Sequence, residues 1–213
     1  QAVTGRSVYT DMWQSDSVDG LPTHIAHVGL AEDADIIAII PATAHTLARL
    51  ANGLADDLIS VTALAARCPL LVAPAMDGSM YAHPAVRANI DTLSRRGAVV
   101  VPPDVGRFAS GMVGEGRLPE TRTLMGYIRR VLGQNGVLYG RRIVVSAGGT
   151  REPIDPVRYL SNRSTGRQGH ALAQAALDAG AREVVLVTAS EWLPVPVGAE
   201  VINVDTAQEM KEA

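Results

Sequence analysis

Short apolar runs recur along the chain, and longer amphipathic stretches separate them. An apolar run of a few residues is typical of a buried strand, whereas apolar residues spaced three and four apart are typical of a helix. The runs predict strands at 35–40, 70–73, 98–101, 142–146, 183–188 and 200–203. The amphipathic stretches predict helices at 43–54, 56–66, 84–96, 120–132 and 167–179, and a helix start at Thr206.

Prolines and glycines mark the limits of these elements. Pro41 and Pro74 follow apolar runs and are predicted to end the strands, because proline removes a backbone donor. Pro84 suits the first turn of a helix. Residues 102–118 are rich in glycine and are predicted to form a loop, and residues 133–140 are predicted to form a linker.

Strands that alternate with helices predict an α/β fold with mainly parallel, doubly wound sheets of the Rossmann or flavodoxin-like kind. The pattern runs through two units, at 1–132 and 141–213, on either side of the linker. Ligands of such sheets bind at the carboxyl ends of the strands. Three segments have that position: 41–45, 74–81 and 146–150.

Composition narrows the possible partners. Hydrophobic residues make up 47% of the 213 residues and aromatic residues only 4%, which predicts an aliphatic core. A net charge of −3 without a basic run argues against nucleic acid as a partner. No apolar run reaches the roughly 18 residues of a membrane span, and the polar start of the chain does not read as a signal peptide. Cys68 is the one cysteine, so no intrachain disulfide is possible and a cytoplasmic location is expected.

Residues 143–169 have the layout of an anion site. An apolar run leads into the small residues Gly148, Gly149 and Thr150, and a polar loop containing Asn162 then leads into the helix predicted at 167–179. Free backbone N–H groups at such a turn and helix start would face a phosphate. A tight turn without a ligand fits the same spacing equally well.

These residues carry a resemblance. Residues 141 to about 210 resemble the phosphopantothenate–cysteine ligase half of the bifunctional coenzyme A biosynthesis flavoproteins, and residues 8–132 resemble the decarboxylase half. In the ligase half, Asn162 matches an asparagine that contacts the acyl-nucleotide intermediate. Gly148, Gly149 and Thr150 match the glycine-rich turn. The resemblance implies CTP as the substrate nucleotide, with Mg²⁺ accompanying it; no metal-ligating residues are predicted.

The decarboxylase half resembles the family at its flavin and base motifs. The sequence Pro-Ala-Thr-Ala-His at 41–45 is similar to the family's Pro-Ala-Ser-Ala-Asn, which implies that Ala42, Thr43 and Ala44 bind FMN. His27 matches the family's catalytic base. His24 is a competing match, but it lies three residues too far from the Ala-Asp pair that ends the motif.

The next motif is the substrate-binding one. Pro74, Met76, Met80 and Tyr81 match positions of the family's Pro-x-Met-Asn-x-x-Met-Trp, with tyrosine in place of tryptophan. Asp77 stands where the family has the asparagine that holds the substrate carboxylate. An ionised Asp77 would repel that carboxylate unless a neighbour neutralises it. Without the resemblance, the two methionines would be read as core residues.

Residues 109–117 resemble the family's flexible flap, with Ser110 in place of its proton-donor cysteine. A serine hydroxyl is a much weaker acid than a thiol, whose pKa is about 8.5. The resemblance, in which some lineages carry aspartate and serine together, implies that the changes at Asp77 and Ser110 compensate each other in a variant active site. The expected catalytic residues are His27, Asp77, Ser110 and Asn162.

The resemblance implies FMN-dependent decarboxylation of 4′-phosphopantothenoylcysteine to 4′-phosphopantetheine, fused to CTP-dependent ligation of 4′-phosphopantothenate with cysteine. It also implies a homo-oligomer whose partners are small-molecule substrates. The family's first strand and flavin-phosphate loop are expected before Gln1, and the ligase's catalytic lysine beyond Ala213. Both units are therefore expected to be incomplete, and the chain alone is expected to bind FMN poorly. Two alternatives remain: a monofunctional cysteine decarboxylase that releases an enethiol, and a non-catalytic flavin-binding regulatory subunit.

Overall fold

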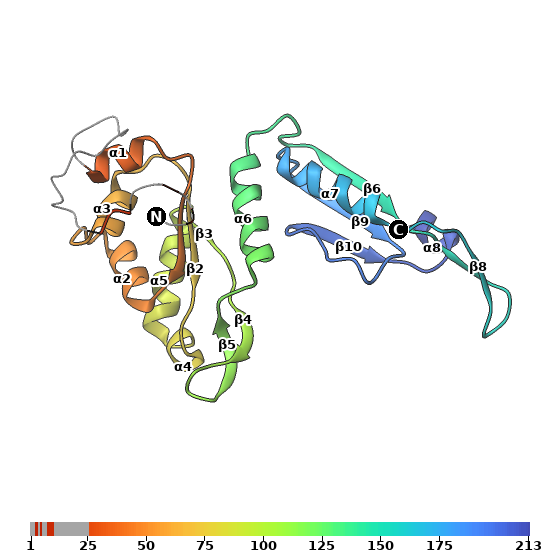
Figure 1. Ribbon diagram of the computed structural model, residues 1–213, viewed down its shortest axis with the longest axis horizontal. Coiled ribbons are helices and arrows are strands. Elements are labelled where there is room, and N and C mark those ends of the chain that lie inside the picture. The colour runs from red at the N-terminus through yellow and green to blue at the C-terminus, as the bar shows by residue number, and fades with distance from the viewer. Residues whose placement is uncertain (1–2, 4, 6–7, 11–25) are drawn as a thin grey trace. The chain divides into compact units, whose positions relative to one another are not determined.

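The computed structural model describes residue 3, residue 5, residues 8–10 and residues 26–213, and its chain divides into two compact units (Figure 1). The first unit is Gln1–Leu124 and the second is Met125–Ala213. Each unit is an α/β structure built on a parallel sheet, as the alternating pattern predicts. None of the helices in the described ranges is long and apolar enough to cross a membrane.

The N-terminal unit has a three-stranded parallel sheet in the order β1-β2-β3. Ile39 of β1 pairs with Val72 of β2, and Leu71 pairs with Val99 of β3. A separate antiparallel hairpin, β4–β5, follows the sheet. The elements are α1 (Ala26–Glu32), β1 (Ile37–Ala42), α2 (Ala44–Asn52), α3 (Leu58–Ala65), β2 (Leu70–Pro74), α4 (Gly78–Tyr81), α5 (Pro84–Arg95), β3 (Val99–Val100), β4 (Asp104–Arg107) and β5 (Val113–Arg117), with α6 (Thr121–Gly133) crossing into the second unit.

The core of this unit lies between the sheet and the helices α2 and α5. Leu47 of α2 and Val72 of β2 are completely buried, and Ile90 and Leu93 of α5 pack into the same cluster. Each such side chain contributes about 1.5–3 kcal/mol by leaving water. This core fixes the carboxyl ends of β1 and β2, where the predicted site segments begin.

Helix α2 begins and ends where the sequence predicts a cap and a break. The Thr43 hydroxyl accepts a hydrogen bond from the Thr46 amide at 3.2 Å, which satisfies one of the free donors of the first turn. Gly53 ends the helix in the left-handed conformation, with φ of 68°. Leu54, which the pattern had included in the helix, therefore lies outside it, and its side chain is exposed.

Helix α3 is present as predicted, but its buried side is different. The amphipathic pattern of 56–66 places the apolar residues Ile59 and Leu64 on its core side, but they are 52% and 63% exposed. Ser60 is the buried residue of this helix. Its hydroxyl is bonded to the Asp57 cap at 2.8 Å, so it can face inward without an unsatisfied polar group.

Other elements depart from the predicted pattern. Strand β1 continues through Pro41, which was expected to end it. The pairing register shifts between Ile39 and Ala42, and such irregularities are where strands accommodate proline. The predicted loop at 102–118 contains the β4–β5 hairpin. Four glycines lie in this segment and lower its apolar content, which hid the strand pattern. Helix α1 was also not predicted.

The C-terminal unit has a parallel sheet in the order β10-β9-β6, with α7 packed on β6 and β9 (Figure 1). Ala173 and Leu177 of α7 pack against Val184 and Leu186 of β9. A second antiparallel pair, β7–β8, occupies the loop after β6. The elements are β6 (Arg142–Ala147), β7 (Arg151–Pro153), β8 (Tyr159–Ser161), α7 (Arg167–Asp178), β9 (Glu183–Thr188), β10 (Ala199–Asn203) and α8 (Ala207–Glu212).

The segment 133–140, predicted as a linker, packs within the C-terminal unit. The Leu138 amide donates to the Ala179 carbonyl at 2.9 Å, and Tyr139 forms an isolated bridge with Ala181. The packing division after Leu124 thus falls inside α6. A packing division and a functional boundary need not coincide, so the predicted domain limits stay a prediction.

Candidate functional site

At the carboxyl edge of the N-terminal sheet, the segments that follow β1 and β2 lie side by side. The Ala75 amide donates to the Ala42 carbonyl at 3.1 Å, which joins the predicted flavin segment to the predicted substrate segment. Ala42 and Pro74 are buried, whereas Thr43 is exposed at the start of α2. The predicted segment at 146–150 belongs to the other unit, so the chain presents two candidate sites.

The start of α2 has a donor set that suits a phosphate. The first amides of a helix, here those of Ala44 and His45, have no partner inside the helix. The hydroxyls of Thr43 and Thr46 lie 3.0 Å apart beside them. Hydroxyl and amide donors at a helix N-terminus favour an anion, so these residues fit the phosphate of FMN.

Asp77 is held by donors on both of its carboxylate oxygens. Its Oδ1 accepts from the Ser79 amide at 3.1 Å and from the Ser79 hydroxyl at 3.0 Å. Its Oδ2 accepts from the Ser110 hydroxyl at 2.7 Å. The Ser110 bond, followed by the two Ser79 bonds, holds the pKa of Asp77 below its usual value. Asp77 is therefore an ionised acceptor. It is hydrogen-bonded to Ser110, the other position at which the sequence departs from the family motif.

The Ser110 contact belongs to a larger contact between the β4–β5 hairpin and α4. The Met76 amide donates to the Gly116 carbonyl at 3.0 Å, and a Cβ on Gly116 would collide with the Met76 carbonyl. The Phe108 ring lies against Gly78 and Gly114, where a Cβ would come within 3.0 Å and 3.3 Å of it. Glycine thus permits a close approach of hairpin and helix.

A cavity of about 270 Å³ lies between the hairpin and α4. Asp77, Tyr81, Phe108 and Met112 are among its lining residues. Of the other predicted substrate residues, Met76 packs against the core cluster and Met80 is 49% exposed. Asp77 and Tyr81 thus share one cavity, and Ser110 is joined to Asp77 by a hydrogen bond.

Three residues of this site were missed by the sequence analysis: Phe108, Arg87 and Glu115. The Arg87 guanidinium lies 4.3 Å from the centroid of the Tyr81 ring and 3.5 Å from the Glu115 carboxylate. Burial raises the pKa of Tyr81, against the opposing effect of the nearby Arg87 charge. Phe108 is the single phenylalanine of the chain and lies in a glycine-rich stretch, which is the signal that could have found it.

His27 lies away from these residues. It sits in α1, which Figure 1 shows at the opposite end of the unit from α4 and the hairpin. Its Nδ1 is buried and has no hydrogen-bond partner among the described residues. The competing His24 lies outside the described residues. Within one chain, the structure does not bring His27 together with Asp77 and Ser110.

The second candidate site is a cavity of about 540 Å³ at the start of α7. It is lined by the end of β6 with Gly148, by residues 163–169 and by Leu172. The side chains of Arg163 and Arg167 are at its wall, next to the N-terminus of α7. Two cations and a helix N-terminus suit a phosphate-bearing ligand.

Asn162 stands beside this cavity without lining it. Its Oδ1 accepts a hydrogen bond from the Ser164 amide at 2.8 Å. The same oxygen lies so close to Gly149 that a Cβ on that residue would collide with it. Gly148, Gly149 and Asn162 are thus close together, and Thr150 follows them toward β7. Among the residues that the structure describes, no cluster of three or more His, Cys, Asp or Glu residues is placed to hold a metal ion.

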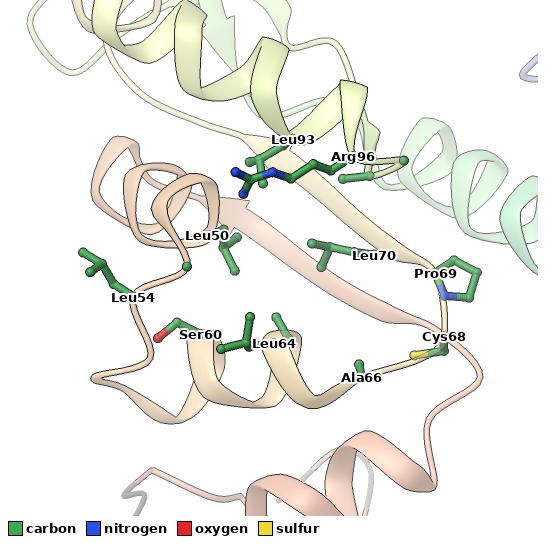
Figure 2. Close-up of a pocket in the computed structure, with 14 residues that line it drawn as sticks. Leu50, Leu54, Ser60, Leu64, Ala66, Cys68, Pro69, Leu70, Leu93 and Arg96 are labelled. Carbon is green, nitrogen blue, oxygen red and sulfur yellow. The ribbon is translucent and has the colours of Figure 1, made fainter.

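A further groove, of about 300 Å³, lies at the amino ends of β2 and β3 (Figure 2). Leu50, Leu64, Leu70 and Leu93 point into it from α2, α3, β2 and α5. The Arg96 guanidinium donates across it to the Ala51 carbonyl at 2.7 Å. None of the predicted site residues lines this groove, and ligands of parallel sheets bind at the other end of the strands.

Two family models match the chain. The model described as "Flavoprotein" matches residues 1–133. The model described as "DNA/pantothenate metabolism flavoprotein C-terminal domain" matches residues 138–213.

Curated relatives match along the whole chain. It is 44% identical over 217 residues to the coenzyme A biosynthesis bifunctional protein CoaBC of Mycobacterium tuberculosis, covering 100% of this chain and 50% of that protein. It is 43% identical over 216 residues to CoaBC of Bacillus subtilis, covering 100% of this chain and 52% of that protein. The chain therefore spans about half the length of these relatives.

Solved structures share the fold of part of the chain. A mutant PPC decarboxylase complexed with pantothenoylaminoethenethiol matches with a TM-score of 0.53 and 34% identity, over 58% of this chain and 69% of that one. The FMN-binding protein AtHal3 matches with a TM-score of 0.50 and 33% identity, over 58% of this chain and 68% of that one.

Proposed function

This chain belongs to the flavoprotein family, and from that membership we propose that it acts in coenzyme A biosynthesis. Its N-terminal unit takes part in the FMN-dependent decarboxylation of 4′-phosphopantothenoylcysteine to 4′-phosphopantetheine. Its C-terminal unit takes part in the CTP-dependent ligation of 4′-phosphopantothenate with cysteine. The names of the CoaBC relatives and of the PPC decarboxylase structure support this assignment.

The observation that carries the decarboxylase proposal is the meeting of two segments at the carboxyl edge of the sheet. Ala42, Thr43 and Ala44 hold the flavin phosphate with the donors of the first turn of α2. Pro74, Met76, Met80 and Tyr81 form the adjoining substrate segment, joined to it through the bond between Ala75 and Ala42. FMN, when bound, supplies the electron transfer that makes the cysteine carboxylate a leaving group.

Asp77 and Ser110 act as a pair in this proposal. The Ser110 proton is directed at Asp77, so it is not directed at a substrate while the hairpin is closed. An ionised Asp77 repels the substrate carboxylate, and the donors of Ser110 and Ser79 reduce that repulsion by partly compensating the charge. Closure of the hairpin excludes water from the reacting atoms.

The C-terminal unit binds the nucleotide phosphates at the start of α7. Gly148, Gly149 and Thr150 form the turn that faces the phosphates, with Arg163 and Arg167 neutralising their charge. Asn162 lies next to the turn and contacts the acyl-nucleotide. Mg²⁺ accompanies CTP and is held by the phosphates.

The proposal extends to the assembly. The protein works in the cytoplasm as a homo-oligomer on small-molecule substrates, without nucleic acid or membrane. Exposed apolar side chains on α3, Ile59 and Leu64, support a surface that a second copy covers. Sedimentation of the full-length gene product measures this directly; a monomer at micromolar concentration would contradict it.

One assay tests the proposed activity. The full-length gene product is incubated with FMN and 4′-phosphopantothenoylcysteine, and carbon dioxide and the sulfur product are measured. Release of carbon dioxide together with reduced 4′-phosphopantetheine is the expected result. An enethiol as the final product would favour a monofunctional cysteine decarboxylase, and flavin binding without carbon dioxide would favour a regulatory subunit.

A further inference from the structure

The imidazole of His170 links helix α7 to the segment that follows β9. His170 is 7% exposed, and both ring nitrogens face partners outside its own helix. Nδ1 lies 3.3 Å from the Pro194 carbonyl oxygen, and Nε2 lies 3.2 Å from the Thr188 hydroxyl. This buried side chain is not among the residues proposed to contact the substrates.

For a neutral imidazole, the partners of His170 define one tautomer. The Pro194 carbonyl can only accept, so Nδ1 must carry the proton and donate it. Nε2 then accepts a hydrogen bond from the Thr188 hydroxyl. The Thr188 oxygen in turn accepts from the Ser190 amide at 3.0 Å. The bonds form one directed chain, from the Ser190 amide through Thr188 to the neutral imidazole and on to Pro194.

This chain of bonds ends at the wall of the α7 cavity. The Ser190 hydroxyl donates to the Thr165 carbonyl at 3.3 Å. The same hydroxyl lies against Gly148 and Gly166, which both line the cavity: a Cβ on Gly148 would be 2.6 Å from it, and a Cβ on Gly166 would collide with it. The position of Ser190 therefore sets the separation of the two glycines.

A histidine whose bonds served only the core would stabilise the fold and nothing else. Here the two bonds of His170 bracket Ser190, because Thr188 precedes it and Pro194 follows it in the chain. Thr188 and Ser190 are themselves 1% and 4% exposed, so the bracketed segment has no water to replace a lost partner. A change at His170 is thus transmitted to Gly148 and Gly166.

We propose that neutral His170 is a positioning residue for the phosphate-binding turn at the start of α7, acting through Thr188 and Ser190 on Gly148 and Gly166. The ligand class is a nucleoside triphosphate. This inference rests on the proposed function, which assigns nucleotide binding to this unit.

Titration calorimetry with CTP and Mg²⁺ on the full-length gene product tests the inference. His170→Ala and Thr188→Val each break the chain of bonds, and each is expected to weaken CTP binding by about tenfold, the equivalent of one buried hydrogen bond. The double variant is expected to bind CTP almost as tightly as either single variant, because all three variants break the same series of hydrogen bonds. Additive losses would contradict a shared path.

Two matched variants separate positioning from general stability. Gln174→Ala removes a 2.8 Å bond to Asp178 on the same helix, away from the cavity, and is expected to leave CTP affinity unchanged. Thr188→Ser keeps the hydroxyl and is expected to bind CTP within about twofold of the parent. If His170→Ala lowers the melting temperature but its folded form binds CTP normally, His170 is structural only and the inference is wrong.

The outcomes for the parent protein distinguish the two proposals. If the parent does not bind CTP, the proposed nucleotide site is wrong. If the parent binds CTP and His170→Ala binds it with the same affinity, only the positioning role is wrong. Should His170→Ala not fold, ¹⁵N NMR of the parent imidazole decides: the inference requires a protonated Nδ1 and a bare Nε2. A ring protonated at Nε2 would break the chain at Thr188 and overturn it.

Discussion

At the scale of single residues, the pair formed by Asp77 and Ser110 changes what each residue can do. Three hydrogen-bond donors face the Asp77 carboxylate, so groups of the protein itself compensate its negative charge. Ser110 is correspondingly held in the hairpin turn by a charge-assisted bond, which is stronger than a neutral one. We therefore interpret the aspartate and the serine as a closing contact that the family's asparagine and cysteine would not form with the same strength.

The Ser110→Ala variant tests this contact. Loss of the Ser110 hydrogen bond, the largest cause of the lowered pKa, is expected to bring the pKa of Asp77 up toward its usual value of 3.8. It is also expected to speed hydrogen exchange at the hairpin amides 108–112. Carboxyl NMR titration and amide exchange measure the two effects. Ser79→Ala is the matched control, because it removes a donor to Asp77 but leaves the hairpin bond in place. Equal exchange in both variants would contradict the closing contact.

The same shift predicts a pH dependence in the unaltered protein. The pKa of Asp77 is lower in the folded protein than in the unfolded chain, so its bonds stabilise the closed hairpin above the unfolded value of 3.8. That stability is lost as the pH falls through the lowered folded pKa. Protection of the hairpin amides is therefore expected to be constant from neutral pH to about pH 4 and to fall below it. Protection that is lost near pH 6 would point to another group.

At the scale of elements, the sequence predicted those whose signals are local. Thr43, Gly53 and Pro84 stand at helix limits because capping and φ preferences act within one turn. The β4–β5 hairpin was missed because its four glycines hid the strand pattern, and because part of what holds it is contact with α4 and Met76, which are distant in sequence. The burial of Ser60 in place of Leu64 likewise depends on tertiary packing, which periodicity does not report.

Gly116→Ala tests how the hairpin is held to α4. Its φ of 146° disfavours a side chain, and the new Cβ would collide with the Met76 carbonyl. We expect a loss of about 2–4 kcal/mol in the free energy of unfolding, measured by urea denaturation. Gly111→Ala is the control, because Gly111 also has a positive φ, of 86°, but no atom within 4 Å of the Cβ position. Equal losses would mean that backbone strain alone matters and the close approach does not.

Two helix caps allow the flavin site to be tested separately from stability. Thr43 caps α2 at the proposed phosphate site, whereas Asp57 caps α3 away from it. Thr43→Ala is expected to cost about 1 kcal/mol of stability, and Asp57→Ala more than that, because Asp57 also forms an ion pair with Arg49 of α2. Only Thr43→Ala is expected to weaken FMN binding, by roughly tenfold for a lost hydrogen bond to phosphate. Flavin fluorescence titration measures the affinity, and an equal loss in both variants would place the phosphate elsewhere.

At the scale of the whole molecule, the sequence motifs do not all meet in one chain. Asp77 and Tyr81 line one cavity and Ser110 donates a hydrogen bond to Asp77, while His27 lies in α1 at the opposite end of the unit (Figure 1). A motif specifies residue types and their spacing, but not which copy of the chain supplies each residue. In the proposed homo-oligomer, His27 of one copy would therefore complete the site of another copy.

Subunit complementation tests that arrangement. His27→Asn and Asp77→Ala are expected to be inactive as decarboxylases when each is assayed alone, because each removes one part of every site. Mixed oligomers, formed by co-expressing the two variants with different tags, would contain some sites with both residues intact. If His27 serves its own chain, no mixed site is intact and activity stays at the background. If it serves a neighbour, carbon dioxide release returns to about a quarter of the parent value for random pairing of copies across each site. A control mixture combines Asp77→Ala with Ser110→Ala, whose altered residues are hydrogen-bonded to each other within one chain. It is expected to show no recovery beyond the activity of its more active member. Recovery confined to the His27 mixture would therefore assign that residue to the neighbouring copy.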